Sequence, residues 1–100
     1  RVFSSLSKYS EEKSDLAFVM DKEITFGQVE DCIRRANKYI KEIRLFDVYE
    51  GGQIPEGKKS MAYTITFAPK EAAFNAEEVQ KFVDKICRTL INDLDIDLRA

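Results

Sequence analysis

The most regular hydrophobic pattern in the chain is a pair of β-prone runs separated by a loop that contains glycines and a proline. The runs cover Leu45–Tyr49 and Met61–Phe67, and they predict two adjacent antiparallel strands. In the second run the side chains alternate between two faces. The apolar face carries Met61, Tyr63, Ile65 and Phe67, and the small, more polar face carries Ser60, Ala62, Thr64 and Thr66.

Two further segments have apolar residues at helical spacing, and each follows a capping box. Thr25 with Gln28 begins the first predicted helix, which we expect to end near Tyr39; Asn75 with Glu78 begins the second. The apolar stripe of the first helix consists of Phe26, Val29, Cys32, Ile33, Ala36 and Ile40. That of the second consists of Val79, Phe82, Val83, Ile86, Cys87, Leu90, Ile91 and Leu94.

Two shorter β-prone runs, Asp15–Met20 and Asp95–Arg99, flank these elements. The resulting order of strand, helix, strand, strand, helix, strand predicts an α+β, ferredoxin-like βαββαβ sandwich. Its four-stranded antiparallel sheet carries both helices on one face and leaves the other face open. We expect residues 1–12 to be a lead-in or linker from a preceding domain and residues 13–100 to form this domain. Because Arg1 is not an initiator residue, we expect the chain to be a fragment of a longer protein.

The strand Leu45–Tyr49 can present either of its two faces to the core. An unpaired buried carboxylate is costly, so we expect Asp47 on the open face and Phe46 and Val48 in the core. Leu45 and Tyr49 then also lie on the open face. The full predicted open face contains Asp15, Ala17, Val19, Leu45, Asp47, Tyr49, Ser60, Ala62, Thr64 and Thr66.

Composition excludes several functions. The formal net charge of −2 argues against bulk electrostatic adhesion to nucleic acid, but it permits a shaped site for one base. With no histidine, the chain lacks His-dependent triads and the usual zinc sites, and no residues are expected to be catalytic or metal-binding. Cys32 and Cys87 have no CxxC spacing and are expected to be reduced core thiols of a cytoplasmic protein. No membrane span or signal peptide is visible.

The small residues of the open face form a shallow floor that could accept a flat ring; the alternative is a solvated sheet face. An aromatic RNA-recognition motif is disfavoured, because the strand 60–67 points its aromatic side chains inward. Lys58 and Lys59, at the end of the glycine–proline loop, are placed to meet a nucleic-acid backbone near this face. Basic residues also cluster on the first helix and just after it. They form either a solvated helix face or a patch that binds phosphate: Arg34, Arg35, Lys38, Lys41 and Arg44.

The string LFDVYEGGQIPEGKKSMA, with DLAFV upstream and FNAEEV downstream, resembles the C-terminal ferredoxin-fold anticodon-binding domain of bacterial phenylalanyl-tRNA synthetase β subunits. The likeness covers the chain from about Lys8 to Arg99. It implies a non-catalytic module that engages the anticodon end of tRNA-Phe. The parent would be an α2β2 ligase that uses ATP and Mg²⁺, with its catalytic centre on the α subunit. No cofactor is implied for this fragment.

The resemblance also implies a binding site. The family's anticodon surface corresponds by position to Ala17, Asp47 and Ser60. Phenylalanine tRNAs of this type carry guanine first in the anticodon, and our hypothesis lays that guanine near Ala17 and Ala62. Asp47 would accept from its N1–H and exocyclic amine, and Ser60 would complete the contact. The complete set of expected tRNA-binding residues is Ala17, Asp47, Tyr49, Lys58, Lys59, Ser60 and Ala62.

The chain also departs from the family pattern, which usually has proline at the position of Ser10 and arginine at Ser14 and near Ala72. The missing cations argue against phosphate contacts at these positions and leave the sheet-face site intact. Two other functions stay open beside tRNA binding. One is a ferredoxin-like domain that senses a small metabolite, and the other is a structural domain that docks within the synthetase.

Overall fold

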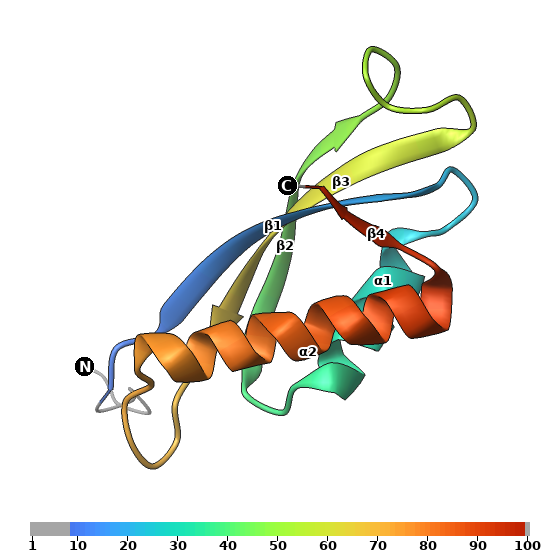
Figure 1. The fold of residues 1–100 in the computed structure, drawn as a ribbon. Helices are drawn as coiled ribbons and strands as arrows, with labels where there is room; N and C mark the ends of the chain where they lie inside the picture. The colour runs from blue at the N-terminus through green and yellow to red at the C-terminus, as the bar shows by residue number, and fades with distance from the viewer. Residues whose placement is uncertain (1–8, 100) are drawn as a thin grey trace.

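Three long strands form the body of the sheet. The structure, a computed structural model, describes residues 9–99. In it β1 (Glu12–Asp21), β2 (Ile40–Tyr49) and β3 (Lys58–Phe67) have ten residues each, and β4 (Asp97–Arg99) has three. The order across the sheet is β2-β3-β1-β4, and all neighbours are antiparallel (Figure 1). The strands β1, β2 and β3 extend further than the hydrophobic runs because polar residues continue their ladders.

The helices α1 (Phe26–Ala36) and α2 (Ala76–Leu94) both begin at the predicted capping boxes. The Gln28 amide donates to Thr25 Oγ1 at 3.2 Å, and the Thr25 amide donates to Gln28 Oε1 at 2.9 Å. The Asn75 and Glu78 pair repeats this exchange at the start of α2. Each box satisfies backbone donors that the first turn of a helix leaves without partners.

The first helix ends three residues before the expected position near Tyr39. Asn37 adopts an extended conformation, and its side-chain oxygen accepts the Tyr39 amide at 2.7 Å. This local hydrogen bond competes with continuation of the helix. The second helix ends at Asp95, which has left-handed dihedral angles and donates its amide to the carbonyls of Ile91 and Leu90.

Both helices lie on one face of the sheet, and the core lies between the helices and the sheet (Figure 1). The ferredoxin-like α+β arrangement is therefore confirmed, with two helices on one face of an antiparallel sheet. Both cysteines are free thiols, Cys32 buried and Cys87 partly so. Within residues 9–99, neither helix is long and apolar enough to cross a membrane. The core contains Phe18, Met20, Val29, Cys32, Ile33, Ala36, Ile43, Met61, Tyr63, Ile65, Phe67, Ile86, Leu90 and Ile96.

The prediction for the faces of β2 is partly wrong. Phe46 and Val48, expected in the core, are 54% and 50% exposed, whereas Leu45, expected on the open face, packs against the core. The reason is a register shift: Leu45 pairs with Tyr63, and the next pair is Asp47 with Ala62. Phe46 is thus the extra residue of a β-bulge, which changes which side chains face the core.

Two other apolar side chains are more exposed than their patterns suggested. Val48 pairs with the buried Met61 but is itself half exposed, and the β2–β3 hairpin extends beyond both helices (Figure 1). Ile91, assigned to the stripe of α2, is 45% exposed. It lies at the edge of the buried stripe, whose centre is occupied by Ile86 and Leu90.

Candidate nucleic-acid interface

The open face of the sheet is organised in cross-strand rows, because paired residues of antiparallel strands project to the same side. β1, β3 and β2 contribute one residue each to a row. Three neighbouring rows are Asp15–Thr64–Arg44, Ala17–Ala62–Asp47 and Val19–Ser60–Tyr49.

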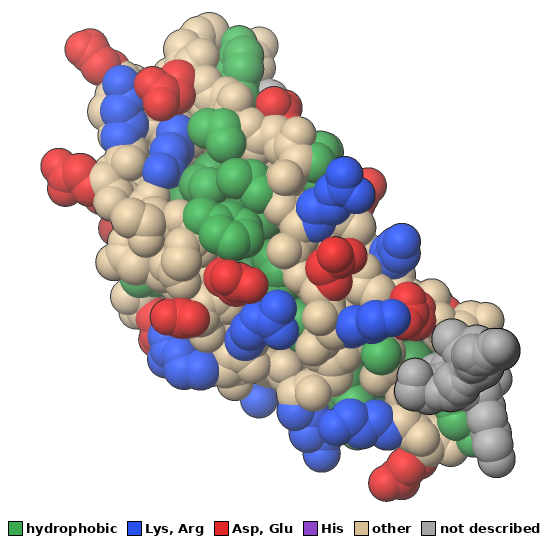
Figure 2. Space-filling view, turned by 180° about the vertical axis from the view of Figure 1, so that it is seen from behind, with side chains coloured by type: hydrophobic (Ala, Val, Ile, Leu, Met, Phe, Trp, Pro, Cys, Tyr) green, Lys and Arg blue, Asp and Glu red, His purple; other side chains and the backbone are tan. Residues whose placement is uncertain are grey.

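The central row has the shape of a small floor with a carboxylate at one side. Ala17 and Ala62 present only methyl groups, so no side chain stands above the sheet at these two positions. Asp47 is exposed at the outer strand of the same row, as expected. Figure 2 shows this side of the molecule, where an apolar area is bordered by acidic and basic side chains.

The row above the floor is more closed. Ser60 is only 3% exposed, because Val19 and Tyr49 pair with it on either side. The Tyr49 hydroxyl extends over the loop and lies where a Cβ atom on Gly52 would stand. Gly52 also has a positive φ of 56°, so this position needs glycine for two reasons. Ser60 therefore lies beneath the surface, with the ring of Tyr49 beside it.

The row below the floor is held by a hydrogen bond. Thr64 Oγ1 donates to Asp15 Oδ1 at 2.7 Å across β3 and β1. Asp15 accepts this bond, whereas Asp47, the carboxylate in the floor row itself, accepts no side-chain hydrogen bond within residues 9–99.

The two loop lysines lie on different sides of the sheet. Lys58 Nζ forms an ion pair with Asp21 at 2.6 Å. Lys59 pairs with the buried Met20, and its ammonium donates to the carbonyl of Ile24 at 2.5 Å. Lys59 therefore points toward the helix side, and the expectation that it lies near the open face is wrong.

Phe46 is the residue that the sequence pattern missed. It lies in the bulge directly before Asp47 and is about half exposed, as is Tyr49 at 43%. The exposed aromatic side chains therefore belong to β2, whereas β3 points its aromatic side chains inward as predicted. The signal in the sequence was the adjacent apolar pair Leu45 and Phe46, which a regular strand would send to opposite faces.

Three groups with a perturbed pKa, Tyr63, Cys32 and Cys87, lie away from this face. Burial raises the pKa of the Tyr63 hydroxyl well above its ordinary value of 10.0. Burial also raises the pKa of the Cys32 and Cys87 thiols. No group of three or more His, Cys, Asp or Glu side chains that could hold a metal ion occurs in the part of the chain that the structure describes.

Comparison with known proteins agrees with this geometry. The family model of the ferredoxin-fold anticodon binding domain matches residues 7–99. The phenylalanine–tRNA ligase beta subunit of Lactococcus lactis is 37% identical over 99 residues, which is 98% of this chain and 12% of that protein. The beta subunit of Clostridium tetani is 41% identical over 98 residues, 97% of this chain and 12% of that protein. The chain thus spans about an eighth of the length of these relatives.

Proposed function

The chain belongs to the ferredoxin-fold anticodon-binding domain family, and on this premise we propose that its open sheet face binds the anticodon end of tRNA-Phe. It would do so as the tRNA-recognition part of a phenylalanine–tRNA ligase beta subunit. This proposal is favoured over a metabolite sensor because the family match and the relatives share nearly the whole chain.

The remaining parts of such an enzyme lie outside this chain. We propose that a second, α subunit joins phenylalanine to the tRNA with ATP and Mg²⁺ in an α2β2 assembly in the cytoplasm. Among residues 9–99, no group of three or more His, Cys, Asp or Glu side chains is placed to hold a metal ion. The contribution of this domain is to position the tRNA.

The observation that carries the proposal is the row Ala17–Ala62–Asp47 with its exposed carboxylate. A guanine lying on the two methyl groups would present its N1–H and exocyclic amine to Asp47. An ionised carboxylate accepts both hydrogen bonds, whereas adenine offers an acceptor at N1 and no amine at C2. The row would therefore distinguish guanine from adenine at the edge of an unstacked loop base.

Neighbouring side chains would support this contact. Phe46 and Tyr49 are exposed on either side of Asp47 in sequence, and aromatic rings hold unpaired bases by stacking. Ser60 is buried next to Tyr49, so we propose that it shapes the floor beneath the base and reaches it only when Tyr49 moves. Lys58, where the loop joins β3, would contact the backbone of the tRNA.

The test is the base preference of the Asp47→Asn variant. Binding of anticodon stem-loops with guanine or adenine at the first anticodon position would be measured by amide chemical-shift titration, and charging kinetics would be measured in the full enzyme. We expect the preference for guanine to fall by about 1–3 kcal/mol, the range of a good bidentate base contact.

The matched control is Asp31→Asn, the same change at an exposed position of α1 on the other side of the sheet. It should leave the preference unchanged. The proposed role of Asp47 is wrong if Asp47→Asn retains the full preference for guanine and an unchanged KM for tRNA.

A further inference from the structure

A groove with a cationic rim lies on the helix side of the molecule, away from the open sheet face. It consists of two hollows of about 320 and 330 Å³. They share Asn37, Phe82 and Lys85 as lining residues, so they adjoin. One wall is the middle of α2, and the other is the connection from α1 to β2.

The rim is strongly biased toward positive charge. Five cationic side chains line the two hollows, against the single acidic side chain of Asp84. The whole chain, in contrast, has a net charge of −2. The cationic residues are Arg35, Lys38, Lys81, Lys85 and Arg88. The basic groove, as we call these two hollows with their rim, is thus a local exception to the charge of the chain.

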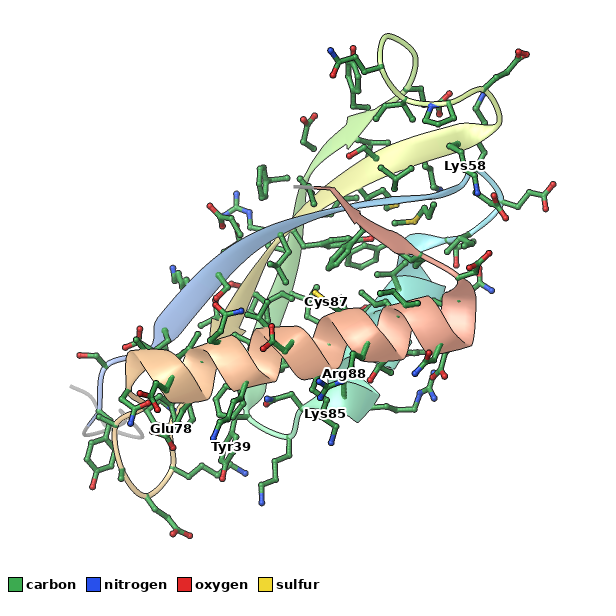
Figure 3. The ribbon with its side chains drawn as sticks, in the orientation of Figure 1. Tyr39, Lys58, Glu78, Lys85, Cys87 and Arg88 are labelled. Atoms are coloured by element: carbon green, nitrogen blue, oxygen red, sulfur yellow. The ribbon has the colours of Figure 1, made fainter. Side chains whose placement is uncertain are left out.

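Most of this charge is not compensated within the domain. Arg35 pairs with Asp93 at 3.5 Å, and Lys38 lies 5.3 Å above the ring of Tyr39. Within residues 9–99, Lys81, Lys85 and Arg88 form no side-chain ion pair or hydrogen bond, while Asp84 accepts a hydrogen bond from Gln80 at 2.9 Å. Figure 3 shows Lys85 and Arg88 on the side of α2 that faces the α1–β2 connection.

The floor of the groove is rigid and apolar. Phe82 packs against Tyr39, Phe74 and Phe67, with ring centroids 5.7, 4.9 and 5.3 Å apart. Tyr39 also packs edge-on against Phe74. These rings contact one another and Lys38 lies over Tyr39, so part of their surface is already occupied within the domain. Recognition in this groove would depend on the cations of the rim.

We propose that the basic groove is a docking site for an acidic protein segment, rich in Asp and Glu, from the polypeptide or assembly in which this domain works. Carboxylates would complement Lys81, Lys85 and Arg88, which follow one another at helical spacings of four and three residues along α2. The chain spans only 12% of its relatives, so this domain has a long partner polypeptide to meet in proteins of that kind.

The choice of protein over RNA rests on the proposed function of the open face. The sheet separates that face from the groove, so an RNA bound there would leave the helix side uncovered (Figure 1). The mutual packing of the rings points the same way, since grooves for single-stranded RNA combine cations with aromatic side chains that stack on bases. The groove would hold the domain in place while the opposite side reads the base.

The experiment is an amide chemical-shift titration of the chain with a ten-residue oligoglutamate peptide, an anticodon stem-loop RNA and inorganic phosphate. The peptide should shift the amides around Asn37–Tyr39 and Lys81–Arg88, and added salt should weaken its binding. Lys85→Glu replaces an attraction at the centre of the groove by a repulsion. It should raise the dissociation constant of the peptide about 2- to 10-fold, as expected for exposed ion pairs.

The matched control is Lys70→Glu, which makes the same charge change at an exposed position outside the groove. It should leave peptide binding nearly unchanged. Equal effects of the two variants, or shifts spread over the whole surface, would overturn the proposal in favour of a solvated helix face. The proposal would also be overturned if RNA or phosphate shifts the amides of the groove and the peptide does not. None of these results depends on Asp47, so the two proposals fail separately.

Discussion

The strands β2 and β3 form one hairpin and have the same length, yet their sequences predict their faces with different success. In β3 every second residue from Met61 to Phe67 is buried against the helices. In β2 the alternation holds from Ile43 to Leu45 and then shifts at Phe46. A strict period of two identifies a face only as long as the ladder is regular.

The difference follows from position in the sheet. β3 lies between β1 and β2 and pairs on both edges, whereas β2 is an outer strand with one free edge. A central strand cannot take an extra residue without disturbing two ladders, and an edge strand disturbs only one. The bulge at Phe46 also has a consequence for the site, because it keeps both Leu45 on the core side and Asp47 on the open side.

The largest expected effect comes from deleting one residue in each strand. Removing Phe46 leaves Leu45 followed by Asp47, and normal alternation then keeps both on their present faces. Removing Thr64 reverses the faces of one half of β3 relative to the other. We therefore expect the Thr64 deletion to prevent folding, whereas the Phe46 deletion retains a cooperative unfolding transition in circular dichroism. Loss of folding in both deletions, or in neither, would contradict the assignment of the bulge.

The second test makes the same substitution in both strands. Phe67 is fully buried and Phe46 is 54% exposed. Phe67→Ala should lower the free energy of unfolding by about 3–5 kcal/mol, the usual cost of truncating a buried phenylalanine. Phe46→Ala should cost less than about 1 kcal/mol in urea denaturation, since surface changes have small effects.

The order of the two variants should reverse when RNA binding is measured, with Phe46→Ala having the larger effect and Phe67→Ala the smaller. Phe46→Ala should weaken anticodon stem-loop binding by about 1–3 kcal/mol if its ring stacks on a base. Ile91→Ala is the control, because Ile91 is similarly exposed at 45% but lies on α2. If Phe46→Ala costs as much stability as Phe67→Ala, then Phe46 belongs to the core and the bulge is wrongly placed.

These differences define how far the sequence could predict the molecule. The capping boxes at Thr25 and Asn75 located both helix starts, because the signal is local and each partner lies three residues away. The outward position of Asp47 was also predicted, since burying a lone carboxylate is costly. The helix ends were less accurate, because α1 is ended by a hydrogen bond of Asn37 that competes with the helical pattern.

The finer features of the site could not be predicted, because they depend on contacts between strands. The burial of Ser60 results from Val19 and Tyr49, which are far from it in the chain. Lys59 has the same parity as Met61 and so lies on the helix side, but its hydrogen bond to the carbonyl of Ile24 in the β1–α1 loop joins distant segments. The alternation of residues along one strand contains no information on either contact.

The third test is the dependence of stability on alkaline pH, which reports the burial of Tyr63 on the core face of β3. In the folded state burial raises its pKa above the ordinary 10.0, so the unfolded state releases its proton first. Stability is then complete below pH 10 and falls above it, by up to about 1.4 kcal/mol per pH unit for one group. The raised pKa of Cys32 and Cys87 adds to the fall from about pH 9, their ordinary value being 9.0.

The Tyr63→Phe variant isolates this contribution. Within residues 9–99, the only hydrogen-bond partner of the Tyr63 hydroxyl is the sulfur of Met61, at 3.5 Å, so removing the hydroxyl should cost little at pH 7. Urea denaturation between pH 8 and 11 should show a shallower decline for this variant than for the natural chain. Tyr49→Phe retains Tyr63 and should keep the full decline. An unchanged slope in Tyr63→Phe would show that Tyr63 is not buried in solution.

The smallest expected effect concerns the open face of β3, where Thr64 donates to Asp15 at 2.7 Å. Thr64→Val keeps the shape and the β-propensity of the side chain but removes the donor. Because Asp15 is exposed and water can replace the hydroxyl, we expect a loss of about 0.5–1 kcal/mol. A double-mutant cycle with Asp15→Ala separates this bond from the general effect of each substitution. A coupling energy near zero would mean that the row Asp15–Thr64–Arg44 is joined only through the backbone ladder. The side-chain hydrogen bond on the polar side of β3 would then add no stability, as at the exposed end of β2.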